Sequence, residues 1–100
     1  MDIREVQART WANKQAKGLA SDDVPYEFAL AYGELAEAFD AWRKDPAKLG
    51  EELADVMIYL SAIAAMNGID LDSAVEAKLA VNEARSYVRG TNGTLIKEEG

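Results

Sequence analysis

The chain contains no cysteine and no histidine among its 100 residues. Without cysteine, neither a disulfide framework nor a thiolate metal site can form. Without histidine, the chain cannot build an imidazole zinc site, a Ser-His-Asp or Cys-His nucleophile, or the Glu-x-x-His motif of ferritin-like di-iron proteins. A glycine-rich phosphate loop of the G-x-x-x-x-G-K type is also missing from the sequence. Carboxylate oxygens therefore remain as the candidate ligands for a metal ion.

Positive charge is scarce, because 11 lysines and arginines stand against 18 acids and give a net charge of −7. Nucleic acid polymers and anionic membranes would repel such a chain, so neither is expected as a partner. No apolar signal-peptide core opens the sequence, and the longest apolar stretch, VMIYLSAIAAM, is too short to span a bilayer comfortably. These features predict a soluble cytoplasmic protein.

Alanine supplies much of the apolar composition, which favours closely packed helices over sheet. We predict one all-α domain over residues 1–89, followed by a tail, residues 90–100, that is expected to be poorly ordered or to pair weakly. Apolar residues recur at helical spacing in four segments, which predict helices over about 3–17, 26–44, 47–67 and 71–89. Asp70 is a good N-cap, and Gly18 and Gly68 are natural helix stops.

The apolar positions of the two central helices predict which faces are buried. In the second helix they are Phe28, Tyr32, Leu35, Phe39 and Trp42; in the third they are Leu49, Leu53, Val56, Met57, Leu60 and Ala64. Short connections favour antiparallel neighbours, so we predict a four-helix up-and-down bundle. A thin core predicts a homodimer, with close approach of another helix over the small residues Ala29, Gly33 and Ala36.

Two pairs of acids flank these predicted core faces, with Glu34 and Glu37 in the second helix and Glu52 and Asp55 in the third. At about 100° per residue, Glu34 lies to one side of its apolar stripe, whereas Glu37 falls nearly opposite that stripe. Glu52, Asp55 and Tyr59 share one side of the third helix. Antiparallel packing would gather three or four carboxylates around one space, and they cannot all stay ionised without a counterion. Mg²⁺ or Mn²⁺ would supply it; the alternative is ordinary solvated acids.

The fourth predicted helix changes character along its inward-facing line, where Lys78, Asn82 and Arg85 follow apolar residues. This line is either a solvated helix end or a surface that contacts phosphate and sugar. Trp11 in the first helix could likewise stack on a base or pack in the core or a dimer interface.

The motif Glu34-x-x-Glu37, 14 intervening residues and Glu52-x-x-Asp55 within EELADVMIYL resembles the MazG-like, all-α nucleotide pyrophosphohydrolases. The resemblance includes Lys78-x-x-x-Asn82 and covers roughly residues 3 to 89. It implies hydrolysis of a nucleoside triphosphate, commonly a deoxy or non-standard one, to the monophosphate and pyrophosphate, as nucleotide-pool house-cleaning. It also implies Mg²⁺, with Mn²⁺ as an alternative, and a dimer or a dimer of dimers.

Matching to the family motif implies that Glu52 and Asp55 are metal ligands. Glu34 and Glu37 complete our set of candidate metal ligands. Tyr59, Lys78 and Asn82 would contact the nucleotide, with Arg85 and Trp11 as further substrate-binding candidates.

This chain departs from the family pattern at Ala31, where many members carry an additional glutamate three residues before the one that Glu34 matches. Glu27, one helical turn earlier, is our candidate substitute. Either Glu37 or Glu27 would orient the attacking water. The rival hypothesis is a non-catalytic helical dimer module that keeps the family fold, and Ala31 is the feature that favours it.

Overall fold

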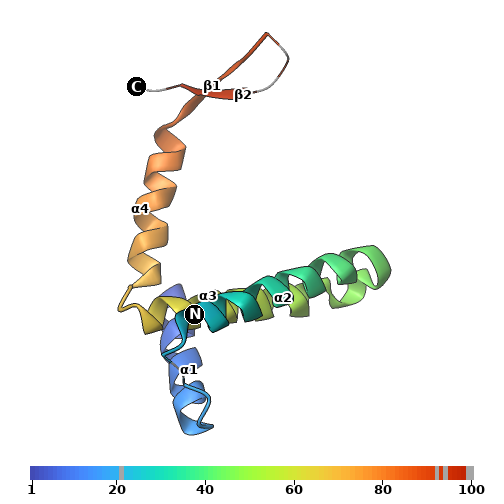
Figure 1. Ribbon diagram of the computed structural model, residues 1–100. Helices are drawn as coiled ribbons and strands as arrows, with labels where there is room; N and C mark the ends of the chain where they lie inside the picture. Colours follow the sequence, from blue (N-terminus) through green and yellow to red (C-terminus); the bar gives the residue numbers. More distant parts are fainter. Residues whose placement is uncertain (21, 92, 94, 99–100) are drawn as a thin grey trace.

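The computed structural model describes residues 1–20, 22–91, 93 and 95–98. These residues form four α-helices, one short 3-10 helix and a two-stranded antiparallel sheet. In chain order the elements are α1 (Ile3–Ala16), α2 (Val24–Lys44), η1 (Pro46–Lys48), α3 (Leu49–Met66), α4 (Leu71–Ala84), β1 (Ser86–Arg89) and β2 (Leu95–Glu98). The predicted all-α character is confirmed, and α2 and α3 lie side by side as an antiparallel pair with α1 across one end (Figure 1).

The helix ends are where local sequence chemistry places them. Asp2, Asp23 and Asp70 are N-caps whose carboxylates accept hydrogen bonds from backbone N–H groups three residues later, satisfying donors that have no helical partner. Gly18 and Gly68 follow α1 and α3 with φ of 69° and 66°, a left-handed conformation that glycine adopts without strain. The predicted stops of the first and third helices are therefore confirmed.

The C-terminal part differs from the prediction, because α4 ends at Ala84 rather than near Arg89. β1 and β2 pair as a hairpin in which Val88 faces Ile96 across the strands, so the hairpin crosses the expected boundary between residues 89 and 90. Tyrosine and valine favour extended backbone over helix, which explains the early helix end. Of the expected tail, residues 92, 94 and 99–100 lie outside the described residues.

The predicted core face of α2 is wrong. Its aromatic stripe, defined as Phe28, Tyr32, Leu35, Phe39 and Trp42, is 45% to 72% exposed. The buried residues of α2 are instead Glu27, Ala31 and Ala38, which form the face toward the rest of the chain. Small side chains let α2 and α3 approach closely, so alanine occupies the contact and the aromatic stripe remains uncovered.

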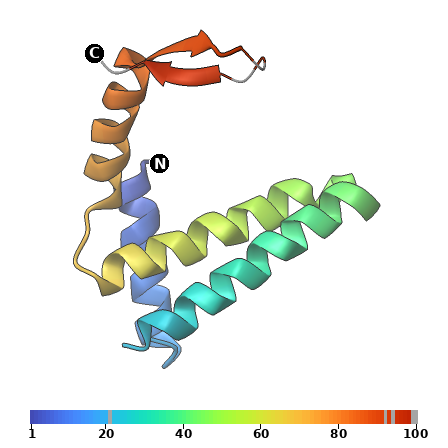
Figure 2. The same ribbon diagram turned by 45° about the horizontal axis from the view of Figure 1, so that its top comes forward.

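α4 departs from the α2–α3 pair, so one chain does not form an up-and-down four-helix bundle (Figure 2). A bend of 108° separates the segments Pro46–Met66 and Leu71–Ala84. The radius of gyration is 17.0 Å, against about 13 Å for a compact chain of this length. The accessible surface is 7320 Å², against roughly 5600 Å² for a folded monomer of this mass. The single chain is therefore open.

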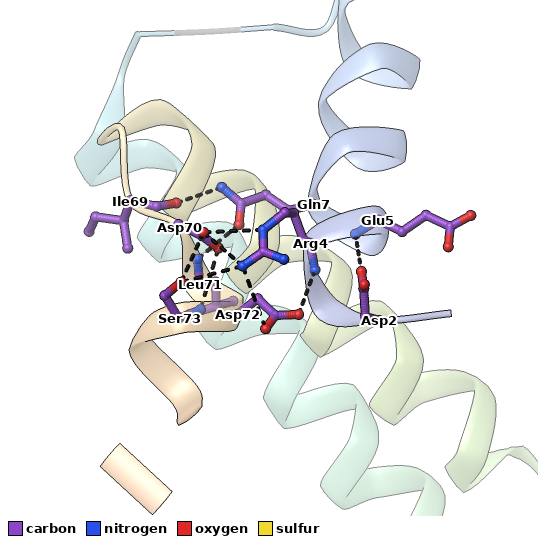
Figure 3. A network of polar contacts seen from close by, with 9 residues as sticks. All are labelled: Asp2, Arg4, Glu5, Gln7, Ile69, Asp70, Leu71, Asp72 and Ser73. Atoms are coloured by element: carbon purple, nitrogen blue, oxygen red, sulfur yellow. Dashed lines mark hydrogen bonds and ion pairs between the residues drawn. The ribbon is translucent and has the colours of Figure 1, made fainter. Parts of the chain in front are cut away.

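A polar network fixes the start of α4 against α1 (Figure 3). The Arg4 guanidinium lies 3.0 Å from the Asp70 carboxylate and 3.8 Å from that of Asp72. The Gln7 side chain donates to the Ile69 carbonyl at 2.6 Å and accepts from the Leu71 N–H at 3.1 Å. These contacts give α4 a defined direction although it lies away from α2.

Among the described residues, no single helix combines the length and apolar composition needed to cross a membrane. The bent pair Pro46–Met66 and Leu71–Ala84 meets that test only when its two helices are taken together.

Candidate metal centre

Three carboxylates from two helices converge where α2 and α3 run side by side. Glu34 and Glu37 come from α2 and Glu52 comes from α3, and one oxygen of each lies within 4.8 Å of the others. An i, i+3 spacing places the first two on neighbouring parts of one helix, and the antiparallel pairing brings the third opposite them. The structure thus brings together three of the four acids predicted as metal ligands.

Glu37 is the acid whose position the helical geometry had misjudged. Its predicted direction was measured from the aromatic stripe, which is exposed. Measured from the face that α2 does bury, formed by Glu27, Ala31 and Ala38, Glu34 lies roughly 40° away and Glu37 roughly 100° away. A long side chain at that angle can still reach the edge shared with α3.

Asp55, the fourth predicted ligand, acts electrostatically on the same cluster. The pKa of Glu34 is raised by desolvation and then by Glu37 and Asp55, and the pKa of Glu52 is raised by desolvation and by the same two acids. In addition, Oε2 of Glu52 is buried and has no hydrogen-bond partner among the described residues. Such an oxygen is costly unless something binds it, so this donor set fits a hard divalent cation.

Glu27, the candidate substitute for the family glutamate, lies in a different environment from the cluster. It is only 3% exposed, and its carboxylate pairs with Nζ of Lys14 in α1 at 3.4 Å. The same ammonium lies 5.7 Å from the centre of the Tyr59 ring in α3. Sequence reasoning missed Lys14, because only tertiary packing brings residues 14, 27 and 59 together.

Tyr59 links this ion pair to the acid cluster. Desolvation raises the pKa of its hydroxyl, and the carboxylates of Glu34, Glu27 and Asp55 raise it further. Tyr59 and Lys14 also line a cavity of about 690 Å³ between α1 and α3. Thr10, Asn13 and Ile58 also line this cavity, which therefore has both polar and apolar walls.

The remaining predicted substrate-binding residues are not brought to the cluster within one chain. Lys78, Asn82 and Arg85 lie on or just after α4, which projects away from α2 (Figure 2). The Arg85 guanidinium donates to Oδ1 of Asn82 at 2.9 Å. Trp11 lines a separate hollow of about 380 Å³ together with Ile69, at the turn between α3 and α4.

Known proteins resemble this chain over the segment that carries the acids. Residues 30–86 match the MazG nucleotide pyrophosphohydrolase domain. The chain is 42% identical over 76 residues to dCTP pyrophosphatase 1 of Rattus norvegicus, a match that covers 65% of this chain and 45% of that protein. It is 46% identical over 44 residues to the dATP/dGTP diphosphohydrolase of Cyanophage S-2L, covering 44% of this chain and 42% of the other. The aligned part thus spans less than half the length of these relatives.

A solved structure resembles the whole fold. The Cyanophage S-2L MazG-like pyrophosphohydrolase, bound to dGDP and three catalytic Mn²⁺ ions per active site, superposes with a TM-score of 0.72 and 31% identity. The likeness covers 100% of this chain and 96% of that one. Together with the match over more than half of the sequence, it establishes that this chain belongs to the MazG nucleotide pyrophosphohydrolase family.

Proposed function

We propose that this protein is a Mg²⁺-dependent pyrophosphohydrolase that converts a nucleoside or deoxynucleoside triphosphate to the monophosphate and pyrophosphate. The observation that carries the proposal is the meeting of Glu34, Glu37 and Glu52 around one space, with a buried oxygen of Glu52 left without a partner. Family membership and the nucleotide-hydrolysing activities named for the relatives support it. Clearance of unwanted nucleotides from the cytoplasmic pool would be its role.

Glu34, Glu37, Glu52 and Asp55 would hold the metal. Bound Mg²⁺ or Mn²⁺ would neutralise phosphate charge and acidify a water molecule for attack at phosphorus. The Mn²⁺ ions of the Cyanophage S-2L structure support this choice of cation. Of the two acids considered for orienting the water, Glu37 is favoured because it is exposed within the cluster, whereas Glu27 is buried against Lys14. Tyr59 would bound the side where the nucleoside enters.

We further propose that the working unit is a homodimer or a dimer of dimers, and that the up-and-down bundle is completed between chains. The uncovered aromatic stripe of α2 and the projecting α4 support this arrangement. In such a dimer, Lys78, Asn82 and Arg85 of one chain would face the acid cluster of the other and contact its substrate. Trp11 could stack on the base from the same side.

A non-catalytic helical dimer remains the second candidate, because Ala31 stands where many family members have a glutamate. The two candidates make opposite predictions for the neutral isosteres Glu52→Gln and Asp55→Asn. For an enzyme, both should abolish the release of pyrophosphate from a panel of nucleotides with Mg²⁺. Metal-free stability should stay equal or rise, because each change removes repulsion.

Thermal melts supply the second measurement. Mg²⁺ should raise the melting temperature of the wild type, because a ligand that binds the folded state stabilises it, and it should do so much less for either variant. The non-catalytic alternative would be established if the wild type released no pyrophosphate from any nucleotide and its melting temperature did not change with Mg²⁺.

A further inference from the structure

Lys14 joins three helices at the edge of the acid cluster. It projects from α1 and pairs with Glu27 of α2 at 3.4 Å, while its ammonium lies 5.7 Å from the centre of the Tyr59 ring of α3. The side chains of Lys14 and Glu27 are only 17% and 4% exposed. Among the ion pairs of the described residues, this is the one in which both partners are mostly buried.

Because the Lys14–Glu27 pair is buried, neither charge can lose its partner without a large cost in free energy, unlike a pair on the surface. A carboxylate at 3% exposure needs a counter-charge, and Lys14 supplies it. Because that charge is committed to Glu27, Lys14 is not free to serve as a phosphate ligand. Its second contact, with the ring face of Tyr59, restricts where this ring can lie.

The location of Tyr59 gives this restriction a consequence for catalysis. Tyr59 lies within electrostatic reach of Glu34 and Asp55, and it also lines the cavity between α1 and α3. Tyr59 therefore borders the cavity and is also close enough to the acid cluster to feel its charge. A ring that shifts would alter how a nucleotide is held while leaving the carboxylates themselves in place.

We propose that Lys14 is a positioning residue for substrate binding: paired to Glu27, it holds the Tyr59 ring fixed at the border of the α1–α3 cavity, close to the acid cluster. This inference rests on the proposed function, since it concerns how the same site holds its nucleotide. It assigns to the Glu27–Lys14 pair a structural task instead of the role of general base.

The test compares steady-state kinetics of Lys14→Met, Lys14→Arg and Lys17→Met on the deoxynucleoside triphosphate that the wild type hydrolyses fastest. Lys17 lies exposed at the end of the same helix, so its replacement removes the same charge without breaking this pair. Lys14→Met should raise KM about tenfold and change kcat by less than about threefold. Lys14→Arg should restore KM to within about threefold of the wild type, and Lys17→Met should match the wild type.

A double-mutant cycle with Tyr59→Leu asks whether Lys14 acts through the ring. The changes in KM should be strongly non-additive, because Lys14→Met has nothing left to disturb once the ring is gone. Mn²⁺ titration by calorimetry should give the same affinity for Lys14→Met as for the wild type, since the metal-binding carboxylates are untouched. Additive effects on KM, or a loss of Mn²⁺ affinity, would refute the positioning role.

Two further controls keep the outcomes distinct. Should Lys14→Met fail to fold, the neutral pair Lys14→Met/Glu27→Gln removes the unpaired buried charge, and its KM should still be raised because the ring contact is lost. If the wild type is active and Lys14→Met behaves like Lys17→Met, the inference fails while the proposed function stands. A wild type inactive on every nucleotide would overturn both.

Discussion

Phe39→Ala should dissociate the proposed dimer, because the uncovered aromatic stripe of α2 is the surface that most requires a partner. Phe39 is 57% exposed in the single chain and stacks on Trp42 with ring centres 5.9 Å apart. Removing its ring deletes apolar area from the middle of this stripe. The chain should keep its helices, because alanine has a higher helix propensity than phenylalanine.

The size of the effect follows from the exposed area. A phenylalanine side chain buries about 200 Å² when fully covered, and 57% of it is exposed here. At about 25 cal/mol per Å², covering that area contributes roughly 3 kcal/mol, of which about 2.5 is lost on truncation to alanine. A two-fold dimer contains the residue twice, so the loss is about 5 kcal/mol, or three to four orders of magnitude in Kd.

Sedimentation velocity over a concentration series measures this shift directly. Tyr26→Ala is the matched control, because Tyr26 is 56% exposed on the same helix but lies roughly 160° from the aromatic stripe. Gly33→Ala tests the small-residue face, since an added methyl group meets no atom within 4 Å in the single chain. Dimer loss with Gly33→Ala but not with Phe39→Ala would show that the small residues form the interface. A wild type that stays monomeric would refute both the aromatic-stripe interface and the small-residue interface.

Two other outcomes follow from the charges. The pKa values of Glu34 and Glu52 are raised above the ordinary 4.5, so their contribution to stability is complete below that pH and is lost as pH rises through the raised values. Metal-free melts should therefore show higher stability near pH 5 than near pH 7.5. The double variant Glu34→Gln/Glu52→Gln should flatten this dependence on pH. Lys14→Met should lower the free energy of unfolding by about 2 to 3 kcal/mol in urea titrations, because it leaves Glu27 buried without a counter-charge. A loss below about 0.5 kcal/mol would mean that the Lys14–Glu27 pair does not contribute to stability.

Local features of the fold could be predicted because each depends on neighbours in the sequence. Asp70 caps α4, and Gly68 ends α3 with a positive φ, as expected from residue type alone. The buried face of α2 could not be predicted this way. The rule that large apolar side chains lie inside assumes that one chain covers them, whereas here Ala31 and Ala38 are buried while Tyr32 is 72% exposed.

The candidate site was predictable to the extent that it follows helical spacing. Glu34 and Glu52 meet because two antiparallel helices bring one acid from each motif to a common edge. The error over the direction of Glu37 came from measuring it against an exposed stripe. Lys14 could not be anticipated, because its contacts with Glu27 and Tyr59 join three helices and correspond to no spacing within any one of them.

The separation of α4 from the acid cluster leads to a test of whether two chains share each site. Lys78 lies on α4, which departs from the α2–α3 pair that carries the acids (Figure 2), so a shared site would take its cation from the partner. Lys78→Ala and Glu52→Gln should each be defective alone. In their heterodimer, both lesions fall in one site and the other site is intact.

Random exchange makes half of all dimers heterodimers, each with one of two sites working, so an equimolar mixture should recover about a quarter of wild-type activity. A site built within one chain would leave every heterodimer site damaged, and mixing would recover nothing. Pyrophosphate release should be measured before mixing and after co-refolding. The control is an equimolar mixture of Lys17→Met chains and Glu52→Gln chains, in which every chain keeps Lys78. Recovery to about a quarter would assign the residues of α4 to the partner's substrate, whereas no recovery above the separate variants would show that α4 must fold back onto its own chain.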